Sequence, residues 1–130
     1  MLEDLDGDGR NDLFITTFAG EPNVLLRNKG DGTFENISVT AGITHIAYSS
    51  SATIGDPDGD GDPDIYVANY LNGIEASDGG QPNFLYRNDG DFRFTEVASG
   101  LGLADAGCGL GATFTDVNLD GRQDLYVAND

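Results

Sequence analysis

The chain has 130 residues, of which 23 are acidic and only 6 are basic, so its formal net charge is −17 at pH 7. This length allows one domain of ordinary size. The charge argues against a nucleic-acid binder or an anionic-membrane binder, because six scattered cations form no basic patch. Hydrophobic residues make up 38% of the chain, which is too many for a disordered acidic tail. Nineteen glycines and eighteen aspartates are the features to explain.

Three simple features limit the class of protein further. Cys108 is the one cysteine in the sequence, so no intrachain disulfide can form. No apolar run reaches the eighteen or so residues of a membrane-spanning helix. Residues 1–4 have neither a basic end nor an apolar core, so they are not a signal peptide. If the natural protein is secreted, we expect this chain to be a processed form or an excised piece.

An acidic pattern of nine residues occurs three times along the chain. Its copies begin at Asp4, Asp56 and Asp116, which are 52 and 60 residues apart. A second block, residues 23–28, returns at residues 83–88. Repeat periods of this length are typical of propeller blades, solenoid turns or arrays.

The segments between these turns read as short β-strands, since they are apolar or β-branched and none keeps a helical period over eleven residues. Four such strands in one repeat are the content of a propeller blade. Residues 65–68 are apolar on both faces, which suits a sheet packed between two others. Turns at residues 29–32 and 89–91 are expected to close hairpins. In chain order the expected strands are Leu13–Thr17, Val24–Arg27, Phe34–Ile37, Ala52–Ile54, Ile65–Ala68, Phe84–Arg87, Phe94–Val97, Ala112–Thr115 and Leu125–Ala128.

Each acidic loop reads D-x-[DN]-x-D-G-x-x-D, which is rich in the oxygen donors that Ca²⁺ prefers. Positions 1, 3 and 5 offer side-chain oxygens, position 7 a backbone carbonyl and position 9 a closing carboxylate. Glycine at position 6 permits the left-handed turn that such a loop needs. We therefore expect up to three calcium sites, one in each loop. The expected ligands are Asp4, Asp6, Asp8, Arg10 and Asp12 in loop 1, Asp56, Asp58, Asp60, Asp62 and Asp64 in loop 2, and Asp116, Asn118, Asp120, Arg122 and Asp124 in loop 3.

Other metal sites fit these loops less well. Zinc and copper are disfavoured because the loops contain no thiolate and no imidazole. An EF-hand needs glutamate at position 12 and flanking helices, whereas position 12 here is Ile15, Val67 or Val127, inside an expected strand. The remaining alternative is a set of solvated Asp/Gly turns without metal, which leaves four carboxylate-type side chains crowded at each loop.

These motifs resemble the FG-GAP/VCBS repeat β-propellers of the integrin-α-like type, in particular the ASPIC/UnbV and cartilage acidic protein-type repeats. The resemblance rests on the three loops with the strands that follow them and on the paired blocks at residues 23–34 and 83–94. It implies that the loop between the first and second strands of each blade binds Ca²⁺ through the side chains named above at positions 1, 3, 5 and 9. Asn118 offers only one neutral oxygen, so we expect the third site to be slightly weaker.

The resemblance also implies an incomplete propeller, because such propellers commonly close with about seven blades. We expect one repeat region over residues 1–130, with about two and a quarter blades of four antiparallel strands. Residues 1–50 form repeat 1, lacking its first strand; residues 51–110 form repeat 2; and residues 111–130 form a partial repeat 3. The open edges and apolar faces of such an incomplete propeller predict that the chain is a fragment of a larger propeller or a protomer that associates head to tail.

The favoured function is a calcium-binding module with a structural, adhesion or protein- or glycan-interaction role, located outside the cytosol in an extracellular or periplasmic space. Weak sites, with Kd of roughly 10⁻⁴–10⁻³ M, suffice in extracellular modules. The alternative is part of a propeller hydrolase or lyase, but no catalytic residues are evident. His45 is expected to have a local structural role. Cys108, which aligns with Tyr48, is expected to be a small core residue.

Three further features have more than one interpretation. Eight residues are inserted in repeat 2 within residues 71–80, either as a contact surface or as an irregular loop. Asn36 begins a glycosylation sequon inside an expected strand, a pattern that is frequent by chance. Arg27 and Arg87 recur at equivalent positions, and we expect each to pair with an acidic group of its own blade.

Overall fold

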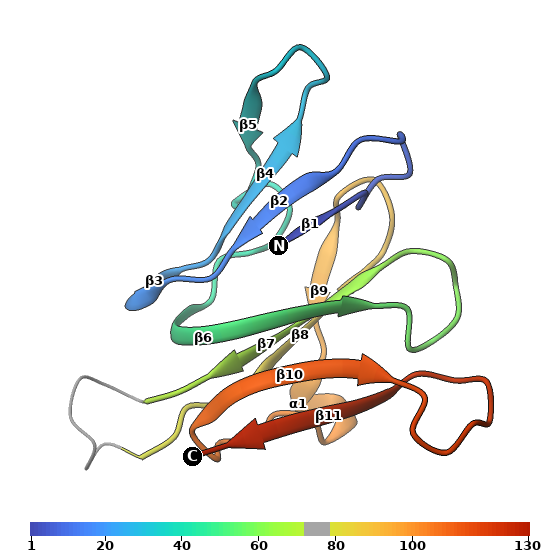
Figure 1. Cartoon of the computed structure of the whole chain (residues 1–130). Coiled ribbons are helices and arrows are strands. Elements are labelled where there is room, and N and C mark those ends of the chain that lie inside the picture. Colours follow the sequence, from blue (N-terminus) through green and yellow to red (C-terminus); the bar gives the residue numbers. More distant parts are fainter. Residues whose placement is uncertain (72–78) are drawn as a thin grey trace.

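The computed structural model describes residues 1–71 and 79–130 and shows an all-β protein. Three antiparallel sheets stack one on the next, as Figure 1 shows. The predicted fold class is therefore confirmed, and the stack is that of a partial propeller. No helix in the described ranges is long and apolar enough to cross a membrane.

Sheet 1 contains four strands, β1 (Leu2–Glu3), β2 (Asp12–Ile15), β4 (Val24–Asn28) and β5 (Phe34–Asn36), in that order. The prediction that repeat 1 lacks its first strand is wrong, because Leu2 and Glu3 pair with Leu13 and Asp12. The Met1 ammonium also donates a 2.6 Å hydrogen bond to the Phe14 carbonyl. A strand of two exposed residues is too short to leave a period in the sequence.

Sheet 2 has five strands, β3 (Phe18–Pro22), β6 (Ile46–Gly55), β7 (Asp64–Asn69), β8 (Phe84–Asn88) and β9 (Phe94–Glu96). The sequence did not predict β3, which lies between β2 and β4 in the chain but pairs with β6, Phe18 opposite Tyr48. The ring centroids of these two residues lie 5.8 Å apart, edge to face. The expected repeat boundary at residue 51 falls inside β6, so the chain of repeat 1 contributes directly to the second sheet.

Sheet 3 consists of β10 (Gly109–Thr115) and β11 (Asp124–Asn129). Before it lies α1 (Ala98–Leu101), a single helical turn that ends at Gly102 with φ 73°. Four residues are too few to show a helical period, and for that reason the sequence did not predict this turn. The described strands therefore number four, five and two in the three sheets, where the sequence predicted three, four and two.

Sheet 2 is packed on both faces, as its sequence predicts. Ile65 and Val67 of β7 belong to a buried cluster that includes Phe14 of sheet 1. Tyr66, between them, belongs to a second cluster that includes Leu125 of sheet 3. Successive side chains of a strand point to opposite faces of its sheet, so one strand serves two apolar layers. Repeated packing of this kind places the three acidic loops along one side of the stack, one at each sheet.

Candidate metal centres

The three acidic loops lie on the same side of the molecule (Figure 1). Loop 1 joins β1 to β2, loop 2 joins β6 to β7 and loop 3 joins β10 to β11. Each loop therefore joins two antiparallel strands, the position that the sequence predicts. The glycine at position 6 has a left-handed backbone in all three, with φ of 83° at Gly9, 92° at Gly61 and 87° at Gly121.

Backbone hydrogen bonds fold loop 1 around its aspartates. The Asp4 carboxylate accepts hydrogen bonds from the amides of Asp8 and Gly9, at 3.1 and 2.8 Å. As a result, one carboxylate oxygen from each of Asp4, Asp6 and Asp8 lies within 4.8 Å of the others. The loop therefore brings positions 1, 3 and 5 together, as a shared cation requires.

Loop 2 repeats this geometry. The Asp56 carboxylate accepts from the amides of Asp60 and Gly61, at 3.1 and 3.0 Å. Carboxylate oxygens of Asp56, Asp58 and Asp60 again lie within 4.8 Å of one another. Two loops 52 residues apart in sequence thus present the same three converging carboxylates.

Loop 3 has the same backbone fold but a different third group. Asp116 accepts from the Gly121 amide at 2.8 Å, and Asp120 accepts from the Arg122 amide at 2.9 Å. Asn118 donates its side-chain amide to Asp120 at 3.1 Å. Loop 3 therefore offers two carboxylates and one amide at the three positions that carry carboxylates in the other loops.

The aspartates at position 9 accept hydrogen bonds from backbone amides and do not join the converging side chains of positions 1, 3 and 5. Asp12, with 1% exposure, accepts hydrogen bonds from the amides of Leu5 and Asn28, at 3.1 and 2.8 Å. Asp64 accepts from the Asn88 amide at 2.8 Å. In loop 3, the corresponding Asp124 accepts from the Val117 amide at 3.1 Å. Each of these side chains ties its loop to the neighbouring backbone.

Burial changes the acidity of two of these aspartates. Desolvation raises the pKa of Asp64 to about 6, although the hydrogen bond from the Asn88 amide acts in the opposite direction. Desolvation likewise raises the pKa of Asp12. A bound divalent cation nearby favours the ionised form of a carboxylate and so opposes this shift.

Arginine side chains lie against loop 1. Arg27 places Nη2 3.0 Å from Asp6 Oδ2 and 4.0 Å from Asp8 Oδ2. Arg10 also pairs with Asp8 through its side chain. The sequence prediction used only the backbone carbonyl of this residue, which occupies position 7 of the loop. The donor set fits a hard cation, because oxygens of three carboxylates converge. Two guanidinium groups, which are themselves cations, already lie beside these carboxylates.

In repeat 2 the equivalent arginine turns away from its loop. Arg87 pairs with Asp89, 2.7 Å between Nη2 and Oδ1. Hydrogen bonds from Thr95 and Arg87 lower the pKa of Asp89. The prediction that both arginines pair with acidic groups of their own repeat is confirmed. Residue 29, at the position of Asp89 in repeat 1, is a lysine, and this difference explains why Arg27 reaches the loop and Arg87 does not.

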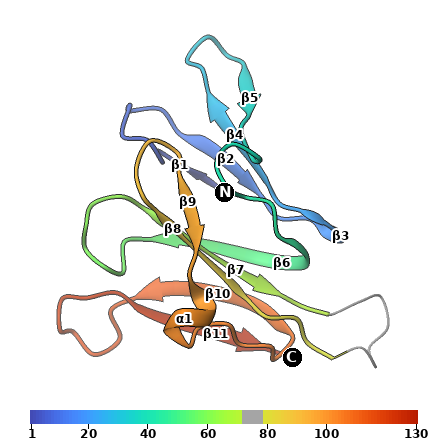
Figure 2. The ribbon, with the colours of Figure 1, turned by 180° about the vertical axis from the view of Figure 1, so that it is seen from behind.

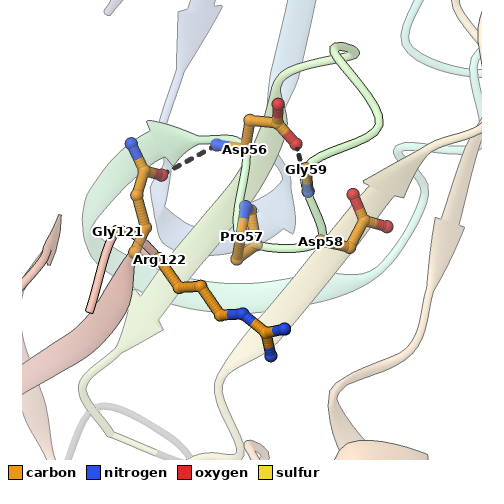
Figure 3. A pocket seen from close by; sticks show the side chains of 7 residues that line it. Asp56, Pro57, Asp58, Gly59, Gly121 and Arg122 are labelled. Carbon is orange, nitrogen blue, oxygen red and sulfur yellow. Dashed lines mark hydrogen bonds between the residues drawn. The ribbon is translucent and has the colours of Figure 1, made fainter.

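A pocket of about 560 Å³ separates loops 2 and 3 (Figure 3). Asp56 and Asp58 line it on one side and Arg122 on the other. Gln123 Oε1 accepts a 2.9 Å hydrogen bond from the Asp56 amide, so the two loops are joined directly. Sequence reasoning missed Gln123, since position 8 carries unrelated residues in the three loops.

Other residues singled out in the sequence have local roles. His45 packs against Phe84 with its ring tilted by 42° and the ring centroids 5.1 Å apart, in line with the structural role expected for it. Cys108 is half-buried with φ 57°, so the prediction of a core position is wrong. Asn36 is exposed at the end of β5, where its side-chain oxygen accepts from Ser38. Most of the insertion, residues 72–78, lies outside the described residues.

Comparison with known proteins agrees with this architecture. Residues 4–67 match the family model of the FG-GAP-like repeat. Over 138 aligned positions, covering 97% of the chain, the sequence is 27% identical to cartilage acidic protein 1 of Xenopus tropicalis and of Homo sapiens, and 26% identical to that of Mus musculus. The chain spans about a fifth of the length of these curated relatives, 20% in each case.

The stacked sheets and the recurring loops define an antiparallel β-repeat protein of the propeller type. Residues 4–67 belong to the FG-GAP-like repeat family. The resemblance seen in the sequence is thereby confirmed.

Proposed function

We propose that this chain is a calcium-binding repeat module with a structural, adhesive or protein- or glycan-interaction role. The observation that carries the proposal is the convergence of three carboxylates at the same strand junction in loops 1 and 2. In loop 1 the ion would be held by Asp4, Asp6 and Asp8; the two other loops offer the corresponding residues. Bound Ca²⁺ supplies charge neutralisation at these carboxylates.

Folding brings these carboxylates together, so cation binding is coupled to stability. In the unfolded chain the aspartates are separated and bind a cation weakly. A ligand that binds only the folded state stabilises it in proportion to ln(1 + [L]/Kd), about 2.7 kcal/mol at a hundred times Kd. We therefore propose that Ca²⁺ rigidifies the side of the stack along which the three loops lie.

We also propose a location outside the cytosol, extracellular or periplasmic. The relatives are named for cartilage, and weak, exposed sites suit calcium-rich extracellular fluids. Self-association through the outer sheet faces belongs to the same proposal. Catalysis forms no part of it, because every group of converging carboxylates found in the described residues belongs to an acidic loop.

The experiment is a thermal melt of the chain in EDTA and in millimolar Ca²⁺, combined with calorimetric titration. We expect Ca²⁺ to raise Tm by several degrees and to bind at up to three sites. Asp8→Asn and Asp60→Asn, at the loop position that is aspartate in all three loops, should each remove one site. Asp91→Asn, the same charge change in an exposed turn, should leave all sites intact. Equal Tm values in EDTA and Ca²⁺ would contradict the proposal.

A further inference from the structure

The turn that follows β5 holds the side-chain amide of Asn36 in one orientation. Asn36 Oδ1 accepts hydrogen bonds from the backbone amide of Ser38 at 3.0 Å and from the Ser38 hydroxyl at 2.7 Å. A backbone N–H can only donate, so the atom that faces Ser38 is the oxygen of the Asn36 side chain. Asn36 Nδ2 donates to no group in the described part of the chain and is open to an external reagent.

Repeat 2 shows that the fold does not require this pair of residues. Glu96 and Ala98 stand at the equivalent positions, 60 residues after Asn36 and Ser38. Glu96 Oε1 accepts hydrogen bonds from the amides of Leu85 and Ala98, at 3.2 and 2.8 Å. One carboxylate therefore binds both amides whose counterparts in repeat 1 donate to the side chains of Ser38 and Asn36. The asparagine and the serine are thus particular to repeat 1.

Residues 36–38 form an N-x-S sequon, the acceptor pattern for asparagine-linked glycans. Asn36 begins the one sequon in the 130 residues. The pattern alone is weak evidence, because an acceptor must also lie at the surface with its amide nitrogen free. Asn36 meets both conditions, since the residue is exposed and its nitrogen has no partner among the described residues.

Asn36 lies at the rim of the stack, on the edge strand of sheet 1 (Figure 2). Its counterpart Glu96 stands directly opposite Tyr86, and opposite residues share one face of a sheet. Tyr86 packs toward sheet 1 and is 0% exposed, whereas Glu96 stays partly exposed. This position is therefore open to solvent even where a neighbouring sheet covers the same face.

We propose that Asn36 is a site of asparagine-linked glycosylation. Nδ2 forms a bond to the anomeric carbon of a saccharide carried on a lipid diphosphate, the bond from that carbon to the diphosphate oxygen breaks, and the nitrogen releases a proton. The products are the glycosylated side chain and the lipid diphosphate. The side chain is still an amide, so Oδ1 keeps the hydrogen bonds from Ser38 and the turn keeps its fold.

The glycosylation site rests on the location outside the cytosol proposed above, because asparagine-linked glycans are added to secreted chains. It does not depend on calcium, since no acidic loop contributes a residue to it. The calcium sites and the glycosylation site therefore stand or fall separately.

The test expresses the full chain behind a secretion signal in mammalian cells and measures the intact mass of the secreted protein. We expect a mass above that of the chain by one saccharide, which a peptide-N-glycosidase removes. This enzyme converts the modified asparagine to aspartate, and in heavy-oxygen water it labels that residue for tandem mass spectrometry. The label should fall on Asn36.

A double variant, Asn36→Glu with Ser38→Ala, gives repeat 1 the residues of repeat 2. It removes the acceptor nitrogen, while the new carboxylate can accept from the turn as Glu96 does. We expect this variant to be secreted, to unfold as cooperatively as the parent chain and to carry no saccharide. The fold of the turn is thereby separated from its modification.

Two outcomes would overturn the proposal. In the first, the secreted parent chain unfolds cooperatively and has the mass of the unmodified chain. In the second, the double variant still carries a saccharide, which then lies on another residue. The location of the protein in its own cells is measured separately by cell fractionation, so a failure of the proposed location is distinguishable from a failure of Asn36 as an acceptor.

Discussion

The side-chain amide of Asn83 donates a 3.0 Å hydrogen bond to the hydroxyl of Tyr66, which itself donates to the Leu103 carbonyl at 3.0 Å. In repeat 1 the corresponding pair is Asn23 and Phe14. Because phenylalanine has no hydroxyl, Asn23 Nδ2 is buried without a hydrogen-bond partner among the described residues. A buried donor left in this way costs about 1–3 kcal/mol.

Phe14→Tyr should therefore stabilise the chain. The new hydroxyl takes the place that Tyr66 occupies in repeat 2 and accepts from Asn23, a gain of about 1 kcal/mol. Urea denaturation measures the change. Tyr66→Phe is the reciprocal variant and should lose about 1–3 kcal/mol, since it leaves Asn83 unpaired. A less stable Phe14→Tyr would show that repeat 1 has no room for the hydroxyl.

Arg27→Gln should increase the calcium affinity of loop 1 severalfold. The Arg27 guanidinium lies 3.0 Å from Asp6 and competes with a cation for that carboxylate. Its removal lowers the positive potential at the loop. Isothermal titration of Ca²⁺ measures the affinity, and Arg93→Gln is the control, because Arg93 pairs with Asp91 in an exposed turn. If both variants bind Ca²⁺ as the parent does, Arg27 does not compete with the cation.

Asn118→Asp should change the stability of the chain in opposite directions with and without Ca²⁺. It gives loop 3 the third carboxylate that loops 1 and 2 possess and removes the amide that donates to Asp120. In EDTA the added like charge should lower Tm, whereas in Ca²⁺ the stronger site should raise it. Scanning calorimetry in both conditions checks the sign. A lower Tm in both would count against a cation site in loop 3.

The sequence predicts the parts of this fold that local chemistry determines. A continuous apolar run at residues 65–68 identifies the centre of β7 (Asp64–Asn69), and the two buried faces of the strand follow from that run. The pairing of β3 (Phe18–Pro22) with β6 was not predictable in this way. Its glycine and proline are typical of a loop, and the strand exists only because residues far along the chain pair with it.

The same limit applies to the candidate metal centres. Spacing alone brings Asp4, Asp6 and Asp8 together, because a tight loop has few ways to fold. It did not reveal that Asp12 binds the Asn28 amide, since that partner comes from another strand. Arg27 reaches loop 1 from another strand and Gln123, at position 8 of loop 3, reaches loop 2, and no pattern within a single motif contains that information.

Gly42, where the turn between β8 and β9 packs against repeat 1, and its counterpart Gly102 in repeat 2 provide a matched pair for the contact between the two repeats. Gly42 and Gly102 both have left-handed backbones, with φ of 87° and 73°. Alanine at either position carries the conformational cost of that region, roughly 1–2 kcal/mol. At Gly42 the new methyl would also lie 2.5 Å from the Phe94 carbonyl oxygen and force the hairpin away.

Gly42→Ala should therefore destabilise the chain more than Gly102→Ala, as measured by urea denaturation. It should also increase the exposure of Phe92, because the hairpin that carries this ring moves with Phe94. Hydrogen exchange at the Phe94 amide, which is bonded to Ala41, reports the loss directly and should accelerate in Gly42→Ala alone. Equal exchange rates in the two variants would mean that the hairpin does not depend on close approach at Gly42.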